Sequence, residues 1–331
     1  MRKIYFILLL LPVFYSCKKS TSNDVLPDPQ LYVYIAGAET NGSVNVAKYW
    51  ENGQATILTD GTKDAWASSV AIAGGNIYVA GQESNGTNYI AKYWKNNQAV
   101  PLTDGTSYAA ATSIAVTGSD IYVSGYEGNA ATYWKNNQAV PLTDGNQSAV
   151  ANSIAIAGND VYVAGEEFNG YFTVAKYWKN GQQTLLTDGT KFSYAKSIAV
   201  AGSDVYVAGY EGGIAKYWKN GQPVSLTDST KQSYAFSIVV VGSDVYVAGY
   251  EINGSVYTAT YWKNGQATPL IEATRDTWVE SIAVVDSRIY ATGRVYNGFV
   301  YGAQYWKNGQ AISLTDGLKD AYGTGIAVVL Q

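Results

Sequence analysis

A Tyr-Trp pair recurs seven times along this chain of 331 residues and limits the possible folds more than any other feature. Its tryptophans are Trp50, Trp94, Trp134, Trp178, Trp218, Trp262 and Trp306. Their spacings are 40 or 44 residues, and such a period is typical of solenoids and β-propellers. We therefore treat residues 31–331 as one repeat domain.

Each repeat predicts four short strands, which we call A, B, C and D in chain order. In one repeat, strand A begins at Ser197, strand B covers 205–209, strand C covers 215–218 and strand D covers 224–227. Their β-branched and aromatic residues are typical of strands that are packed on both faces. Asn-Gly or Asn-Asn follows every strand C and predicts type I′ hairpin turns, because these turns need two residues with positive φ.

The two ends of the repeat region predict that it closes into a ring. The first repeat begins with a strand B at 32–37, whereas the last repeat ends with a strand A at 325–330. If these two strands pair, they complete the four-stranded sheet of the first repeat. The sequence therefore predicts an all-β, seven-bladed β-propeller with four-stranded blades, in which the C-terminal strand A pairs with the N-terminal blade.

Residues 31–331 resemble β-propellers in general, without the Gly-His and Trp-Asp signature of WD40 repeats or the double glycine of kelch repeats. The resemblance therefore implies a fold and no particular activity. We expect a monomeric propeller.

Residues 1–16 have the features of a signal peptide, with cationic Arg2 and Lys3 before an apolar run that is too short to span a bilayer. The segment Phe14-Tyr15-Ser16-Cys17 resembles the lipobox of bacterial lipoproteins, although the family prefers Leu at the position of Phe14. The resemblance implies cleavage before Cys17 and lipidation of that cysteine. The alternative is an ordinary cysteine beside an ordinary cleavage site.

Residues 17–30 are polar, contain two prolines and predict a flexible tether behind the lipidated cysteine. Lys18 stands where some bacteria place an aspartate that retains lipoproteins at the inner membrane. The resemblance therefore implies an outer-membrane lipoprotein, and the leaflet stays open.

Composition excludes several classes of function. The chain has no His, so His-based acid/base relays and Ser-His-Asp triads are excluded. One Cys excludes an internal disulfide and a Cys₄ metal site. The net charge of −4 argues against a nucleic-acid partner. We predict no metal and no cofactor.

Symmetry separates scaffold residues from site residues, because a single ligand needs unequal neighbours. The seven tryptophans therefore predict packing between blades. An Asp after strand D predicts an Asx turn, with calcium binding as the weaker alternative. It occurs at Asp60, Asp104, Asp144, Asp188, Asp228 and Asp316, with Glu272 in the remaining repeat. A Glu after strand B predicts structural hydrogen bonding or pairing with a neighbouring Lys, with a catalytic pair of acids as the alternative. It occurs at Glu39, Glu83, Glu127, Glu167, Glu211 and Glu251.

The loops from strand D to the next strand A break the symmetry. One equivalent position holds Trp66, Ala110, Val150, Tyr194, Tyr234, Trp278 and Tyr322. Three of these loops also carry a cation followed by an aspartate, and ring closure makes the three consecutive. We predict a crescent of binding side chains on this sector. Its members are Trp66, Trp278, Tyr322, Asp64, Asp276, Asp320, Arg275, Arg294 and Glu280. The alternative is that the rings fill the mouth of the propeller and the cation–aspartate pairs stabilise their loops.

Two other sequence features differ between the repeats. The residue next to strand A is the least uniform and is Ser68, Thr112, Asn152, Lys196, Phe236, Glu280 or Thr324. The third and fifth repeats have connections between strands B and C that are four residues shorter, which predicts a notched rim.

Three functions are compatible with these features. The first is a lipid-anchored, non-catalytic module that binds a glycan or a protein through rings and charged groups. The second is a carbohydrate-active hydrolase or lyase that uses Asp64, Asp276, Glu280 or Asp320. The third is a structural subunit of an envelope complex. The first is preferred, so we assign no catalytic residue.

Overall fold

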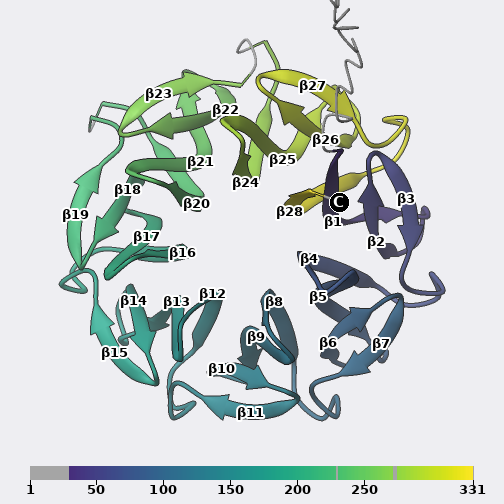
Figure 1. Ribbon diagram of the computed structural model, residues 1–331, viewed down its shortest axis with the longest axis horizontal. Helices are drawn as coiled ribbons and strands as arrows, with labels where there is room; N and C mark the ends of the chain where they lie inside the picture. Colours follow the sequence, from purple (N-terminus) through teal and green to yellow (C-terminus); the bar gives the residue numbers. More distant parts are fainter. Residues whose placement is uncertain (1–29, 229, 271–273, 331) are drawn as a thin grey trace, which may run out of the picture. The chain divides into compact units, whose positions relative to one another are not determined.

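The computed structural model describes residues 30–228, 230–270 and 274–330, which form seven four-stranded antiparallel sheets around a central axis (Figure 1). This confirms the predicted seven-bladed propeller. The predicted signal peptide (1–16), the lipidation site Cys17 and the tether up to residue 29 lie outside the described residues. Among those that are described, no helix is long and apolar enough to cross a membrane.

Each blade runs from an inner strand near the axis to an outer strand at the rim. Blade 1 contains β28 (Ala321–Leu330), β1 (Leu31–Thr40), β2 (Asn45–Glu51) and β3 (Gln54–Ile57). Blade 2 contains β4 (Ala65–Ala73), β5 (Asn76–Ser84), β6 (Tyr89–Lys95) and β7 (Gln98–Pro101). Blade 3 contains β8 (Ala109–Thr117), β9 (Asp120–Glu127), β10 (Ala130–Lys135) and β11 (Gln138–Pro141).

The other four blades repeat this order. Blade 4 contains β12 (Ala149–Ala157), β13 (Asp160–Phe168), β14 (Thr173–Lys179) and β15 (Gln182–Leu185). Blade 5 contains β16 (Ser193–Ala201), β17 (Asp204–Glu211), β18 (Ile214–Lys219) and β19 (Gln222–Ser225). Blade 6 contains β20 (Ser233–Val241), β21 (Asp244–Asn253), β22 (Val256–Lys263) and β23 (Gln266–Pro269). Blade 7 contains β24 (Thr277–Val285), β25 (Arg288–Tyr296), β26 (Tyr301–Lys307) and β27 (Gln310–Ser313).

The ring is closed by β28, which pairs antiparallel with β1 and places Ile326 opposite Ile35. Figure 1 shows the yellow β28 beside the purple β1. The Thr324 hydroxyl donates to the Ala36 carbonyl at 3.0 Å within this blade and to the Ala67 carbonyl at 2.8 Å in the next. The predicted closure is therefore confirmed.

The blades are held together by the tryptophans of the Tyr-Trp pairs. Trp94 of blade 2 is 1% exposed and packs against Tyr34 and Tyr49 of blade 1, and the other six tryptophans are as deeply buried. Because an aromatic side chain buries a large area, these contacts contribute much of the apolar packing between neighbouring sheets. The predicted packing role is confirmed.

The turns and the inner strands follow the residues that the sequence places there. Asn52 and Gly53 both have positive φ (48° and 86°), as a type I′ turn requires. Every inner strand contains a β-bulge, and the bulged residue is the one that varies most between repeats. Opposite the bulge in blade 2 lies Gly81, where a Cβ atom would stand 2.0 Å from the Trp66 carbonyl oxygen. Only glycine allows this approach.

Candidate functional site

One face of the propeller, which we call the upper face, carries the turns between the second and third strands of each blade and the loops between blades. Backbone hydrogen bonds join the two sets: the Ser84 N–H donates to the Asp64 carbonyl at 2.8 Å, and the Tyr296 N–H donates to the Asp276 carbonyl at 2.9 Å. Each interblade loop leads directly into an inner strand, so the variable column that begins with Trp66 surrounds the axis at this face.

Ten aromatic side chains of the upper face form one arc, which we call the aromatic belt. Its members are Tyr194, Tyr210, Tyr234, Phe236, Tyr250, Tyr257, Trp278, Tyr301, Tyr322 and Trp66. Successive contacts from Tyr194 in blade 5 to Trp66 in blade 2 have ring centroids 4.8–5.9 Å apart. All rings except Trp278 are half-buried, so each keeps some surface in solvent.

The belt unites the three rings that the sequence singled out. Trp66 and Tyr322 lie 5.1 Å apart between centroids, and Tyr301 connects Tyr322 to Trp278. The belt is longer than the predicted crescent, because it continues through blade 6 to blade 5.

Arg294 is enclosed by rings of the belt. Its Cζ atom lies 4.9 Å from the ring centroid of Trp278, 5.5 Å from that of Tyr322 and 5.6 Å from that of Tyr301. Its Nη1 donates to Oε1 of Glu280 at 2.8 Å. Burial raises the pKa of Glu280 above its ordinary value, although the guanidinium beside it acts in the opposite direction. Arg294 and Glu280 therefore form a charged pair inside the aromatic surroundings that join blades 7 and 1.

Asp64 is engaged by four hydrogen bonds. Its Oδ1 accepts from the backbone and side-chain N–H groups of Asn45, both at 2.9 Å, while its Oδ2 accepts from Trp66 Nε1 at 3.0 Å and the Tyr89 hydroxyl at 2.6 Å. Burial opposes ionisation, yet these bonds hold the pKa of Asp64 below its ordinary value. The bond to the carboxylate raises the pKa of Tyr89 to about 12.

Asp276 and Asp320 occupy the equivalent positions of their loops. Asp276 Oδ1 accepts the Tyr257 N–H at 3.0 Å, and Asp320 Oδ1 accepts the Tyr301 N–H at 2.8 Å. Each aspartate thus fastens an interblade loop to the third strand of the preceding blade. Arg275 is exposed and lines a separate hollow of about 380 Å³ together with Asp276.

A second charged group lies between blades 4 and 5. Lys196 Nζ donates to Glu166 Oε1 at 2.9 Å, and the Asn152 amide donates to Glu166 Oε2 and to the Ala195 carbonyl. The Glu166 side chain is 9% exposed, and burial raises its pKa although Lys196 and Asn152 oppose that shift. Lys196 Nζ also lies 4.9 Å from the ring centroid of Tyr194, so this network contacts the blade 5 end of the belt.

One hollow of the upper face lies at blade 5, which is one of the two blades with a shorter turn between the second and third strands. It measures about 590 Å³ and is bordered by the glycines of the short turn, Gly212 and Gly213. Five rings and one lysine also line it: Phe172, Phe192, Tyr194, Tyr210, Tyr234 and Lys191. The hollow therefore opens onto the blade 5 end of the aromatic belt, and we call it the blade 5 hollow.

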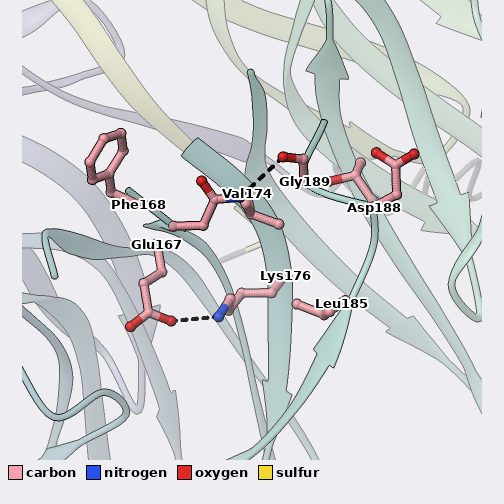
Figure 2. Close-up of a pocket in the computed structure, with 9 residues that line it drawn as sticks. Glu167, Phe168, Val174, Lys176, Leu185, Asp188 and Gly189 are labelled. Carbon is pink, nitrogen blue, oxygen red and sulfur yellow. Dashed lines mark hydrogen bonds and ion pairs between the residues drawn. The ribbon is translucent and has the colours of Figure 1, made fainter. Parts of the chain in front are cut away.

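The repeated glutamates pair with lysines, as predicted, in four blades. The pairs are Glu39–Lys48, Glu83–Lys92, Glu167–Lys176 and Glu211–Lys216, each 2.5–2.6 Å between nitrogen and oxygen. Figure 2 shows Glu167 and Lys176 pointing toward one another in a pocket of about 330 Å³ on blade 4. Because these residues recur from blade to blade, we assign this pocket to the scaffold.

The repeated aspartates form Asx turns, as predicted. In all six, Oδ1 accepts the N–H of the residue two positions later, and Asp60 with Thr62 is one example at 2.9 Å. Glu272, which replaces the aspartate once, lies outside the described residues. Within the described ranges, no group of three or more His, Cys, Asp or Glu could hold a metal ion.

Sequence reasoning missed the part of the belt that comes from the second and third strands. Tyr210 and Tyr250 directly follow the constant glycine of the second strand, in a column that also contains Arg294. Tyr301 is the first residue of β26 and Tyr257 is the second residue of β22, and each lies five residues before the tryptophan. The residue at each of these two aligned positions varies between repeats. An alignment of the repeats at these positions, like that of the interblade loops, would have revealed the additional rings.

In comparisons with known proteins, no protein-family model and no curated protein matches the chain. Among solved structures, it is similar to a chain from a structural and mechanistic study of two prolyl endopeptidases, with 10% identity and a TM-score of 0.43. The match covers 80% of this chain and 50% of the other, so this chain spans about half the length of that endopeptidase. At this identity and score, the likeness supports no statement about activity.

Proposed function

We propose that this protein is a lipid-anchored module of the bacterial cell envelope whose upper face binds a glycan without catalysis. The observation that carries the proposal is the aromatic belt, which covers five of the seven blades with ten rings in contact, nine of them half-buried. Packing alone would repeat in every blade. Partly exposed rings offer flat apolar surfaces to the C–H faces of sugars, while their hydroxyl groups can bond sugar hydroxyls.

The carboxylates favour binding over hydrolysis or lyase chemistry. A glycosidase of the usual kind needs two acids, one of which must give or take a proton at the scissile bond. Asp64, Asp276 and Asp320 accept backbone or side-chain donors of the fold, and Glu280 pairs with Arg294. These acids therefore stabilise loops and the belt.

The decisive experiment compares belt variants on a glycan array, followed by calorimetry with the best ligand. Trp66→Ala and Tyr234→Ala should each weaken binding about tenfold or more, since stacked rings supply much of the contact. Tyr171→Ala is the matched control, because this ring is 81% exposed and lies outside the belt. Unchanged affinity in both belt variants, or binding of a protein and no glycan, would contradict the proposal. Release of reducing sugars by the wild type would instead indicate the enzyme.

The anchor is tested separately. Wild-type protein in its host should incorporate a labelled fatty acid and fractionate with the outer membrane, and Cys17→Ser should do neither. Labelling of the Cys17→Ser variant would show that the lipid is attached elsewhere.

A role as a subunit of an envelope complex is the second candidate, and two exposed apolar side chains favour it. Phe299 is 90% exposed and Leu318 is 77% exposed, and their loops are joined by a hydrogen bond from the Asn297 amide to the Gly317 carbonyl at 2.9 Å. Cross-linking in native envelopes should capture a partner that Phe299→Ser loses. Equal capture by both forms would remove this candidate.

A further inference from the structure

The blade 5 hollow is built differently from the rest of the upper face. The turn between β17 and β18 is short, and the Lys191 side chain extends beside its glycines: a Cβ atom on Gly212 would lie 3.5 Å from Lys191 Cδ. Phe172 and Phe192 meet edge to face on one side, with centroids 5.1 Å apart. The belt rings Tyr194, Tyr210 and Tyr234 also line the hollow.

A column of cations accompanies the belt around the ring. Five interblade loops have a Lys or Arg three residues before an aromatic residue that is the second residue of the inner strand, and the other two loops have neither. The five pairs are Lys63–Trp66, Lys191–Tyr194, Lys231–Tyr234, Arg275–Trp278 and Lys319–Tyr322. All five cations are exposed. In the seven loops, cation and ring therefore occur together or not at all.

The residue after each cation differs between two sectors, although Lys63 and Lys191 each help to lower the pKa of the Asx-turn aspartate in their own loop. In three loops the next residue is an aspartate, as in Lys63-Asp64. At blade 5 the corresponding residues are Phe192 and Gln232. The acid whose pKa Lys191 helps to lower is Asp188, and Oδ1 of that acid already accepts the N–H and hydroxyl of Thr190. Among the described residues, Lys191 is also the only charged side chain that lines the hollow.

From this arrangement we infer that the blade 5 hollow binds a carboxylate-bearing sugar, a uronic acid of a linear glycan, with the sugar ring against the tyrosines and its carboxylate near Lys191. The inference rests on the proposed glycan-binding function and adds the place and the ligand class. A volume of about 590 Å³ accommodates one or two sugar residues. The remaining units of the glycan would follow the belt toward blades 6 and 7.

The test uses two probes that differ only in charge: a linear oligomer of galacturonic acid and the same oligomer with every carboxyl group methyl-esterified. The whole protein should bind the acid form about five- to tenfold more tightly at low salt, and added salt should reduce this preference. Lys191→Gln should bring the two affinities within about twofold. Lys63→Gln, the same change in the same column beside Asp64, should keep the preference.

A second variant tests the place independently of charge. Gly213→Asn adds a side chain beside Gln232 and Tyr234, and asparagine already tolerates a similar backbone at Asn97, where φ is 69° against 79° for Gly213. It should weaken both oligomers about tenfold while the melting temperature stays near that of the wild type.

Each other outcome is informative. Equal affinity of the wild type for both oligomers, or binding of neutral glycans only, overturns the inference and leaves the proposed function standing. A preference that persists in Lys191→Gln, or unchanged binding in Gly213→Asn, shows that the carboxylate lies elsewhere. If no glycan binds but an acidic peptide does, both the inference and the proposed function are wrong.

Discussion

Aromatic side chains occupy two regions of this propeller and behave differently in each. The tryptophans of the Tyr-Trp pairs occur in all seven blades and are at most 1% exposed. The rings of the aromatic belt occur in five blades, and most of them are half-buried. Packing between identical blades demands the same residue everywhere, whereas a ligand contacts only part of a face. The comparison therefore separates scaffold from site on physical grounds, even though both regions use the same residue types.

The largest expected effect is on stability, when the same substitution is made in each of the two regions and the free energies of unfolding are compared. Trp218→Ala should lower the free energy of unfolding by about 3–5 kcal/mol, because it leaves a cavity between blades. Trp66→Ala should cost only about 1–2 kcal/mol, because that ring is already partly in solvent. Urea denaturation measures both. Equal losses would break the distinction between scaffold and belt.

A substitution of Arg294 tests whether the ion pair with Glu280 stabilises the aromatic belt. Arg294→Met keeps much of the apolar stem but leaves Glu280 without its cation, which should cost about 1–3 kcal/mol. Adding Glu280→Gln should recover part of this loss, and a double-mutant cycle measures the coupling. A coupling near zero would mean that the rings alone position these side chains.

The contribution of Asp64 to stability should depend on pH. The folded protein lowers the pKa of Asp64 below the ordinary value of 3.8, so its stabilising contribution is complete above that pH and is lost as the pH falls through the lower folded pKa. The melting temperature of Asp64→Asn should therefore lie furthest below that of the wild type near neutral pH. The two curves should converge in acid. A constant difference down to the lowest pH would contradict this assignment.

The smallest expected effect comes from adding the lysine partner that Glu127 lacks in blade 3. In blade 3 the glutamate has no lysine opposite it, because Thr132 takes that position, and burial raises the pKa of Glu127. Thr132→Lys should recreate the Glu211–Lys216 arrangement and raise the free energy of unfolding by about 0.5–1 kcal/mol. Thermal unfolding checks the sign, and a lower stability would show that blade 3 cannot accommodate the longer side chain.

The fold could be predicted from the sequence because its signals are local and repeated. Seven Tyr-Trp pairs set the number of blades, and turns such as Asn52-Gly53 fixed the hairpins. Even the neighbourhood of Trp66, Trp278 and Tyr322 followed from closure, since a ring makes the first and last loops adjacent.

The chemistry of the site was less predictable, because it depends on partners that are distant in sequence. Nothing in the local sequence Lys-Asp-Ala-Trp indicates that Asp64 accepts from Asn45, nineteen residues earlier. The ion pair between Lys196 and Glu166 joins two variable columns of neighbouring blades across thirty positions. Side-chain direction at a bulge decides such pairs, and a repeat alignment does not contain it.

The pairing of β28 with β1 also determines when the propeller can close during folding. A hydrogen bond from Thr324 to Ala36 spans 288 residues, so the pairing of β28 with β1 cannot form until β28 has been synthesised. Until then β1 presents an unsatisfied edge, which is a hazard for aggregation in a nascent chain. Contacts of such long range form slowly. Closure of the ring therefore has to wait for β28, and the edge of β1 stays unpaired in the nascent chain until then.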